Sequence, residues 1–510
     1  MNQKRSGILI RYLNIIIDFF IAIFFTPFIL RMLGEAEYGL YRIVQSFAGQ
    51  LSVMSFGIAT LVARNIVRYD TLKEREKKEN FLGTAAVTSV LLAILVFAVG
   101  FVLSFGIEPL FDRTLSAGEL SLAKKLYWIL IANMAITILT DMATGILVGH
   151  EKFFAQNIFI TIKQLCRILM IFILLNFGFG SLAIVCSDFL LSFLLMIIEY
   201  FYGFLNLKER IKFYCFDKEE LKISLTFSFA IFLQAIVNQV NQNLDSVILG
   251  ALTSTETVTM YSVALSLFTM FNSITMVFGT VFVPKATKMI TTGATGEQLT
   301  DLVIKPGRFA LMVGNLIITG FIIFGKEFIG YWVGTQYDKA YLVAIILMIP
   351  GILPLIQNVT NAILDAMMKR LGRTIILFSM ALINIIVSII LVTKIGYLGA
   401  AIGTAFSYIV GYIVFLNIHL KKVTGMNIIR MYKEIFSRIA ITAVLCLAIG
   451  FSLHFWNSDS IIIMGIKILL YTGFYSIATY AFAMNNNEKA IVKEIVKEIV
   501  YNILPKRRKS

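Results

Sequence analysis

The chain has 510 residues, of which 58% are hydrophobic and 15% are charged. Lys and Arg outnumber Asp and Glu by 45 to 30, which gives a net charge of +15. The basic residues lie mainly in loops between apolar segments, where anionic lipid headgroups would attract them. Nucleic-acid binding is therefore not expected. The four cysteines and three histidines show no disulfide or metal-ligand spacing, and no Walker loop or dinucleotide fingerprint occurs, so we expect no metal, no cofactor and no ATP-driven chemistry.

Fourteen apolar segments follow one another along the chain. A helix of about 20 apolar residues crosses a hydrocarbon core of about 30 Å, so each segment can span a membrane once. The segments cover roughly residues 8–31, 39–66, 80–106, 122–149, 153–177, 181–205, 221–251, 257–284, 309–330, 340–366, 373–393, 397–420, 436–456 and 461–484. The sequence therefore predicts an all-α, polytopic membrane protein with about 14 transmembrane helices.

Loops rich in Lys and Arg alternate with loops that are poor in them. The basic loops include residues 68–78, 208–222, 285–308, 369–373 and 421–438. Because basic loops stay on the cytoplasmic side, the alternation predicts that both termini are cytoplasmic. The first segment is too long for a signal-peptide core, so we expect it to remain as an anchor in the inner (plasma) membrane of a bacterial or archaeal cell.

Glycine-containing landmarks recur after about 216 to 222 residues, which predicts a six-helix unit used twice. The pairs are Leu33-Gly34 with Leu249-Gly250, Gly57 with Gly279, and Gly178 and Gly180 with Gly396 and Gly399. Six spans preserve orientation, so the two lobes should be related by an axis along the membrane normal, and transporters of this kind bind substrate between lobes. We predict an N-terminal lobe at 1–207, a C-terminal lobe at 208–422, two additional transmembrane helices at 423–484, and a cytoplasmic amphipathic helix with a basic tail at 485–510.

The final region combines an amphipathic segment and a basic tail. Ile and Val residues between 491 and 500 collect on one helical side, which predicts a helix lying at the membrane surface. The basic residues at 506–509 could contact acidic lipids or could simply be solvated.

A polar stripe runs along the seventh apolar segment. Gln234, Asn238, Asn241 and Asp245 share one helical face, which could not face lipid without a large cost. Amides and a carboxylate suit sugar hydroxyls, which both donate and accept hydrogen bonds. Polar packing between helices is the alternative.

The fourth to sixth segments carry further polar faces, including two cations one turn apart. The faces are Asn133, Thr137, Thr140 and Thr144, flanked by Asp141; Gln156, Lys163 and Arg167; and Asp188, Ser192 and Glu199. Cations inside a membrane need carboxylate partners or an anionic ligand. Lys163 and Arg167 could therefore pair with Asp141 and Asp188, or could receive a phosphate when a cavity opens.

Four charged residues could couple an ion or bind substrate in addition to these. Asp18, one turn after Asn14, could take up a proton or sodium ion or form a salt bridge, and Asp245 could act similarly as an ion-coupling residue. Arg42 and Arg64 lie near opposite ends of the second segment, where they could bind substrate or extend to the membrane surface.

Three motifs resemble bacterial polysaccharide-export flippases. They are PFILRMLGEAEYGL at 27–40, FGIATLVAR at 56–64 and GYLGAA at 396–401. The resemblance covers essentially the whole chain and places it in the multidrug, oligosaccharidyl-lipid and polysaccharide exporter superfamily. It implies a non-enzymatic, alternating-access transporter that moves a polyprenyl-pyrophosphate-linked oligosaccharide from the cytoplasmic to the outer leaflet. The implied partners are this substrate, membrane lipids and, as a further option, other polysaccharide assembly proteins.

The resemblance leaves other substrates open. A cation-coupled multidrug exporter should favour carboxylates and aromatic residues in its cavity, so Lys163 and Arg167 argue against it. A peptidoglycan-precursor lipid flippase shares the architecture and needs a substrate assay to be distinguished. A membrane polysaccharide polymerase should have a sizeable catalytic external loop, whereas the longest external loop here is about residues 106–121 and lacks His.

Overall fold

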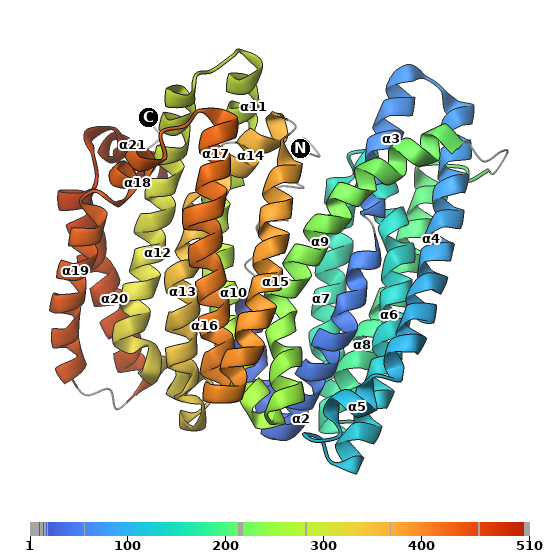
Figure 1. Ribbon diagram of the computed structural model, residues 1–510, viewed down its shortest axis with the longest axis horizontal. Coiled ribbons are helices and arrows are strands. Elements are labelled where there is room, and N and C mark those ends of the chain that lie inside the picture. Colours follow the sequence, from blue (N-terminus) through green and yellow to red (C-terminus); the bar gives the residue numbers. More distant parts are fainter. Residues whose placement is uncertain are drawn as a thin grey trace, which may run out of the picture. The chain divides into compact units, whose positions relative to one another are not determined.

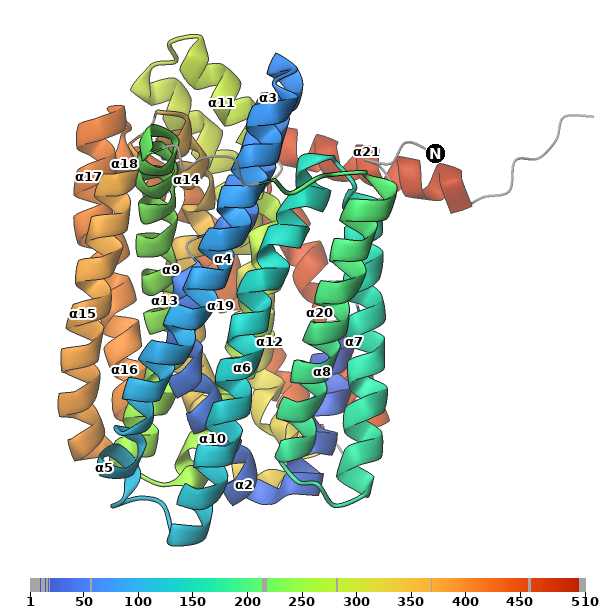
Figure 2. The ribbon, with the colours of Figure 1, turned by 90° about the vertical axis from the view of Figure 1, so that its right-hand side faces the viewer.

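The computed structural model is entirely helical in the residues that it describes (Figure 1, Figure 2). The described backbone comprises residues 10, 14, 17, 19–55, 57–212, 218–280, 283–367, 369–456 and 460–503. Side chains are described in these ranges except at 218–231, 241–242, 275–280, 283–284, 454–455 and 495–503. The prediction of an all-α fold is confirmed.

The helices form two compact units. The first unit comprises Met1–Ser266 with Arg373–Ser407, and the second comprises Leu267–Gly372 with Tyr408–Ser510. The additional helical pair and the C-terminal helix therefore belong to the second unit. The repeat of residues 1–207 and 208–422 stays a prediction.

The first unit contains the helices on which most of the predicted site residues lie. Its helices are η1 (Ile21–Phe25), α2 (Thr26–Gly49), η2 (Gln50–Ser55), α3 (Ile58–Leu72), α4 (Arg75–Ser104), α5 (Ile107–Phe111), α6 (Ala117–Gly149), α7 (Phe153–Asn176), α8 (Leu182–Phe201), η3 (Tyr202–Asn206) and α9 (Lys218–Leu252), with most of α15 (Arg370–Ile395), the start of α10 (Thr255–Thr280) and α16 (Tyr397–Tyr408). Helix α6 is central, packing against α2, α3, α4 and α8.

The second unit is organised around α12. Its helices are the end of α10, α11 (Val283–Thr291), α12 (Gly296–Trp332), η4 (Thr335–Tyr337), α13 (Ala340–Ile356), α14 (Asn358–Ala366), η5 (Ile409–Leu416), α17 (Asn417–Thr424), α18 (Ile428–Phe436), α19 (Ile439–Gly450), η6 (Phe451–Phe455), α20 (Ile461–Ala478), η7 (Thr479–Ala483) and α21 (Asn486–Ile503). Helix α12 packs against α13, α18, α19 and α20. Ile323, Phe324, Cys446, Tyr471 and Tyr475 lie in the core between α12 and the α19–α20 pair.

Twelve helical segments in the described residues are long and apolar enough to cross a membrane. The first, Ile21–Leu72, covers parts of two predicted segments in one nearly continuous helical run. The predicted segment at 221–251 falls within α9, Lys218–Leu252, many of whose side chains lie outside the described set. The fourteen predicted segments therefore lie mainly on helices where they are described, and the chain is a multi-pass membrane protein.

The first helical run breaks at Gly34. The φ of Gly34, 74°, is a left-handed conformation that residues with a Cβ rarely adopt. Pro27 lies in the first turn of α2, which directly follows η1. In α13, Pro350 and Pro354 precede the end of the helix at Ile356.

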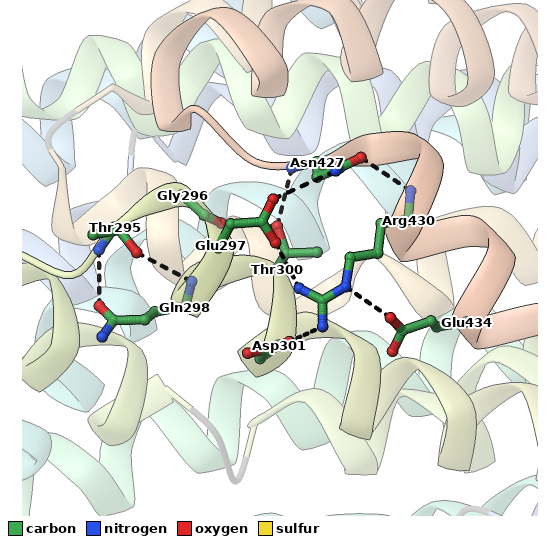
Figure 3. Close-up of polar contacts among 9 residues, drawn as sticks. All are labelled: Thr295, Gly296, Glu297, Gln298, Thr300, Asp301, Asn427, Arg430 and Glu434. Carbon is green, nitrogen blue, oxygen red and sulfur yellow. Dashed lines mark hydrogen bonds and ion pairs between the residues drawn. The ribbon is translucent and has the colours of Figure 1, made fainter.

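Within the second unit, ion pairs join α18 to α12, and α21 lies in a different orientation from its neighbours. Partly exposed Arg430 on α18 pairs with Glu297 and Asp301 on α12 and with Glu434 on its own helix (Figure 3). Helix α21 runs across the direction of α19 and α20 (Figure 2). This orientation suits the predicted surface helix, whereas the basic tail at 506–509 lies outside the described residues.

Candidate functional site

Arg167 on α7 and Asp188 on α8 form a two-point ion pair. The Nε of Arg167 donates to Oδ1 of Asp188, and its Nη2 donates to Oδ2 at 3.1 Å. The hydroxyl of buried Tyr41 on α2 also hydrogen-bonds to this arginine. The planar guanidinium thus presents the fork geometry that suits a carboxylate or a phosphate equally well.

Lys163 lies one turn before Arg167 on the same helix. Its Nζ donates to the hydroxyl of buried Ser192 on α8 at 2.9 Å. Asp188 and Glu199 are its anionic neighbours, but it forms no salt bridge within the described part of the chain. Its positive charge is therefore held by a neutral hydroxyl and stays available to an anion.

Arg42 adds a third cation beside Tyr41. Its Nη1 donates to Oε1 of Gln45 at 3.1 Å, whereas its Nε is buried without a hydrogen-bond partner among the described residues. Tyr41 lies within electrostatic range of both Arg42 and Arg167. We call Arg42, Lys163 and Arg167 the cationic cluster.

Two further carboxylates approach the cluster from the α6–α8 interface. Glu199 is buried and accepts a hydrogen bond from Thr144 at 2.6 Å. Asp141 and Lys163 are its charged neighbours. The predicted partners of the cations are thus divided, because Asp188 contacts Arg167 directly whereas half-buried Asp141 lies next to Glu199.

The predicted threonine face of α6 does not act as one surface. Thr137 and Thr140 donate to carbonyl oxygens of their own helix, at 2.8 Å each, and Thr137 is exposed while Thr140 is buried. Thr144 instead donates to Glu199 of another helix, α8. Gln156 lies half-buried near the start of α7.

The stripe on α9 divides into two sites. Gln234 donates to Asn238 at 3.1 Å and accepts from Thr374 of α15 at 3.5 Å. The side chain of Asn241 lies outside the described set. Asp245 instead is buried, and one of its oxygens, Oδ2, accepts from Tyr261 at 2.6 Å and from Thr404 at 2.8 Å.

Asp245 belongs to a network of neutral oxygen and nitrogen groups. Asn384 on α15 donates to Thr404 at 3.2 Å and accepts from Ser388 at 3.0 Å, and Ser388 also contacts Asp245. Hydroxyl, amide and carboxylate oxygens of this kind can hold a proton or a hard cation.

The remaining predicted residues lie elsewhere. Asp18 lies outside the described residues, although nearby Asn14 accepts a hydrogen bond from Thr161 of α7 at 2.5 Å. Arg64 lies exposed on α3, whereas the cationic cluster comes from α2 and α7. The sequence analysis did not predict five of the residues at these sites: Tyr41, Tyr261, Asn384, Ser388 and Thr404. For the last four, the one available signal was that a buried carboxylate such as Asp245 needs polar partners.

Comparisons with known proteins give a family and a fold. The family model described as "Polysaccharide biosynthesis protein" matches residues 5–290. The "Uncharacterized membrane protein EpsK" of Bacillus subtilis (strain 168) is 26% identical over 164 residues, which are 31% of this chain and 31% of that protein. The aligned part of the chain thus spans about a third of the length of this curated relative.

Two solved structures share the fold over most of both chains. The "Lipid II flippase MurJ, inward closed conformation" has a TM-score of 0.70 at 19% identity and covers 94% of this chain and 98% of its own. The "Inward-facing conformation of a multidrug resistance MATE family transporter of the MOP superfamily" has a TM-score of 0.60 at 14% identity, with coverages of 81% and 98%. At these identities the likeness establishes the fold alone.

Proposed function

Because the chain belongs to the polysaccharide biosynthesis protein family, we propose that it is a flippase that moves a polyprenyl-pyrophosphate-linked oligosaccharide from the cytoplasmic to the outer leaflet. The observation that carries this proposal is the cationic cluster in the first unit. It combines two guanidinium groups and an ammonium group with one directly paired carboxylate, Asp188. A pyrophosphate supplies the multiple negative charges that such a cluster can bind.

Exchange of partners at Arg167 provides a route for binding and release. A phosphate oxygen replaces Asp188 on the guanidinium, and Tyr41 keeps the arginine oriented during the exchange. Lys163 exchanges the Ser192 hydroxyl for a second phosphate oxygen. When the headgroup leaves, Asp188 returns and prevents an uncompensated buried cation. Transport of this kind breaks no covalent bond.

Sugar binding is assigned to the polar side chains on α9. Gln234 and Asn238 pair with each other and offer both donors and acceptors, as sugar hydroxyls require. Asn241 shares their helical face by sequence spacing and is proposed with them. Arg64, exposed on α3, is proposed to meet the substrate before it reaches the cationic cluster.

Two energy sources can drive the movement. An inside-negative potential favours outward transfer of an anion by about 2.3 kcal/mol per charge for every 100 mV. Coupling to a proton or sodium ion is proposed at Asp245, where the neutral network leaves the carboxylate charge to be balanced by a cation. Asp18 and Asp141 are further coupling candidates. With both termini in the cytoplasm of an inner-membrane protein, α21 would lie at the cytoplasmic surface.

The decisive experiment measures leaflet exposure of a fluorescent polyprenyl-pyrophosphate oligosaccharide in liposomes under an imposed voltage and proton gradient. The wild type should translocate the lipid, and the folded Lys163→Ala/Arg167→Ala variant should not. Lys124→Ala is the matched control, because the partly exposed Lys124 pairs with exposed Glu108, away from the cationic cluster. If the double variant still translocated the lipid, the cationic cluster would not be needed for transport.

The same liposomes separate the alternative substrates. Translocation of a lipid-linked peptidoglycan precursor in preference to the oligosaccharide would identify the function implied by the name of the MurJ structure. Efflux of a cationic dye with no lipid translocation would instead identify a drug exporter, as the name of the MATE structure implies.

A further inference from the structure

His150 joins four segments of the first unit at the ends of their helices. It caps the end of α6, and its Nε2 lies 2.7 Å from Oε1 of Glu209, in the segment that follows η3. Its Nδ1 lies 3.8 Å from Oδ2 of Asp70 on α3. Lys78 on α4 bridges the same two carboxylates, at 2.7 Å from each.

The segment Leu207–Lys212 is pinned to α4 at a second point. The backbone N–H of Lys212 donates to the carbonyl of Glu79 at 3.2 Å, and its Nζ lies 3.0 Å from the Glu79 carboxylate. Arg75 pairs with the same carboxylate at 3.1 Å. This second point carries no histidine, so any pH response near neutrality must come from the first.

The charges around His150 are unbalanced when its ring is neutral. Asp70 and Glu209 contribute two negative charges and Lys78 contributes one positive charge. A proton on His150 balances the set. It also converts the Nδ1 that faces Asp70 from a lone pair into a donor, so that both ring nitrogens donate to carboxylates.

Glu209 stays ionised throughout this change. Burial raises the pKa of its carboxyl, but hydrogen bonds from His150 and Lys78 outweigh that effect and hold the pKa below its ordinary value. Only 5% of its side chain is exposed, so the carboxylate depends on these two partners. Among protein side chains, histidine is the one whose unperturbed charge change falls between about pH 5 and 8.

We propose that His150, Glu209, Asp70 and Lys78 form a pH-sensitive latch that holds the segment Leu207–Lys212 against the ends of α3, α4 and α6. The latch is tight when His150 is protonated and loosens when the ring loses its proton. The segment precedes α9 in the chain, the helix that carries Gln234, Asn238 and Asp245. Glu151 and Lys152 flank His150 in sequence as the other charged groups of its own turn.

The test places a nitroxide spin label on exposed position 210 in the full chain in liposomes, after Arg210→Cys with the native cysteines replaced by serine. The label should be immobile at about pH 6 and several-fold more mobile at about pH 8. His150→Gln keeps a hydrogen-bond donor but cannot titrate, so its label mobility should not change with pH. His419→Gln is the matched control and should respond like the wild type.

Two results would overturn the latch. One is equal mobility of the wild-type label at both pH values, and the other is a pH response that persists in His150→Gln. Should His150→Gln fail to fold, Glu209→Gln supplies the second test, because removing the negative charge that His150 and Lys78 share should leave the label mobile at both pH values. The readout needs no transported substrate, so it stands apart from the flippase proposal.

Discussion

Arg308 on α12 and Glu488 at the start of α21 form an ion pair that is buried on both sides, although 180 residues separate them. Nε lies 2.6 Å from Oε1 and Nη2 lies 3.2 Å from Oε2. The other donors of Arg308 reach the carbonyl oxygens of Glu434, Ser437 and Ala483. One guanidinium thereby joins α12 to the ends of α18, η7 and α21.

Glu488→Gln should destabilise the second unit by about 3 kcal/mol or more, because it leaves a buried guanidinium without its counter-charge. Thermal unfolding in detergent measures the effect. Arg430→Ala is the control: Arg430 contacts three carboxylates, but solvent screens these partly exposed pairs, so its loss should destabilise the protein much less than Glu488→Gln does. Equal losses in the two variants would show that burial does not decide the strength of these pairs.

The contrast between these two arginines also marks what the sequence can predict. Apolar segment length predicts the helices because every backbone polar group in a membrane must be satisfied within its own segment. Both arginines fall in regions that are merely basic in the sequence. Which one becomes buried depends on how α21 returns to α12, and no local pattern contains that information.

The two candidate sites differ in the same way. Lys163 and Arg167 could be found because cations inside an apolar segment are rare, and Asp188 could be named as a partner by its depth. The α9 stripe was predicted as one face, yet the partners of Asp245 come from α10, α15 and α16. Helical spacing predicts which side chains share one face of α9. It does not predict which neighbouring helix contacts each part of that face.

Asp188→Asn should strengthen binding of inorganic pyrophosphate to the purified protein. The aspartate competes with the anion for Arg167, so removing its charge should raise the affinity about tenfold, or about 1.4 kcal/mol. Transport should slow, since the headgroup loses the competitor that releases it. Calorimetry and the liposome assay measure the two effects. Asp112→Asn, on an exposed turn, should change neither, and weaker pyrophosphate binding in Asp188→Asn would contradict the exchange of partners at Arg167.

Asp245→Asn should abolish the effect of the coupling ion. If the neutral network binds sodium, replacing potassium by sodium should raise the Tm of the wild type, because an ion that binds only the folded state stabilises it. If it binds a proton, the Tm should respond to pH in place of sodium. In Asp245→Asn the sodium response should vanish or the pH response should become smaller, whereas Asp338→Asn, whose carboxylate pairs with exposed Lys326, should respond like the wild type. If the Tm of the wild type changed with neither sodium nor pH, Asp245 would not be a coupling residue.

Acid should weaken the first unit through Glu209. Its folded-state pKa lies below the ordinary value of about 4.3, so its stabilising effect is fully present above that pH and is lost as the pH falls through the lower folded-state value. Unfolding followed between about pH 6 and pH 3 should therefore show a smaller acid-dependent loss in Glu209→Gln than in the wild type. Glu108→Gln provides the control, because the pKa of Glu108 is also lowered, by a hydrogen bond from Lys124, but its pair is exposed and screened by solvent. If Glu108→Gln flattened the acid response as much as Glu209→Gln, the stabilisation could not be assigned to the His150–Glu209–Lys78 contacts.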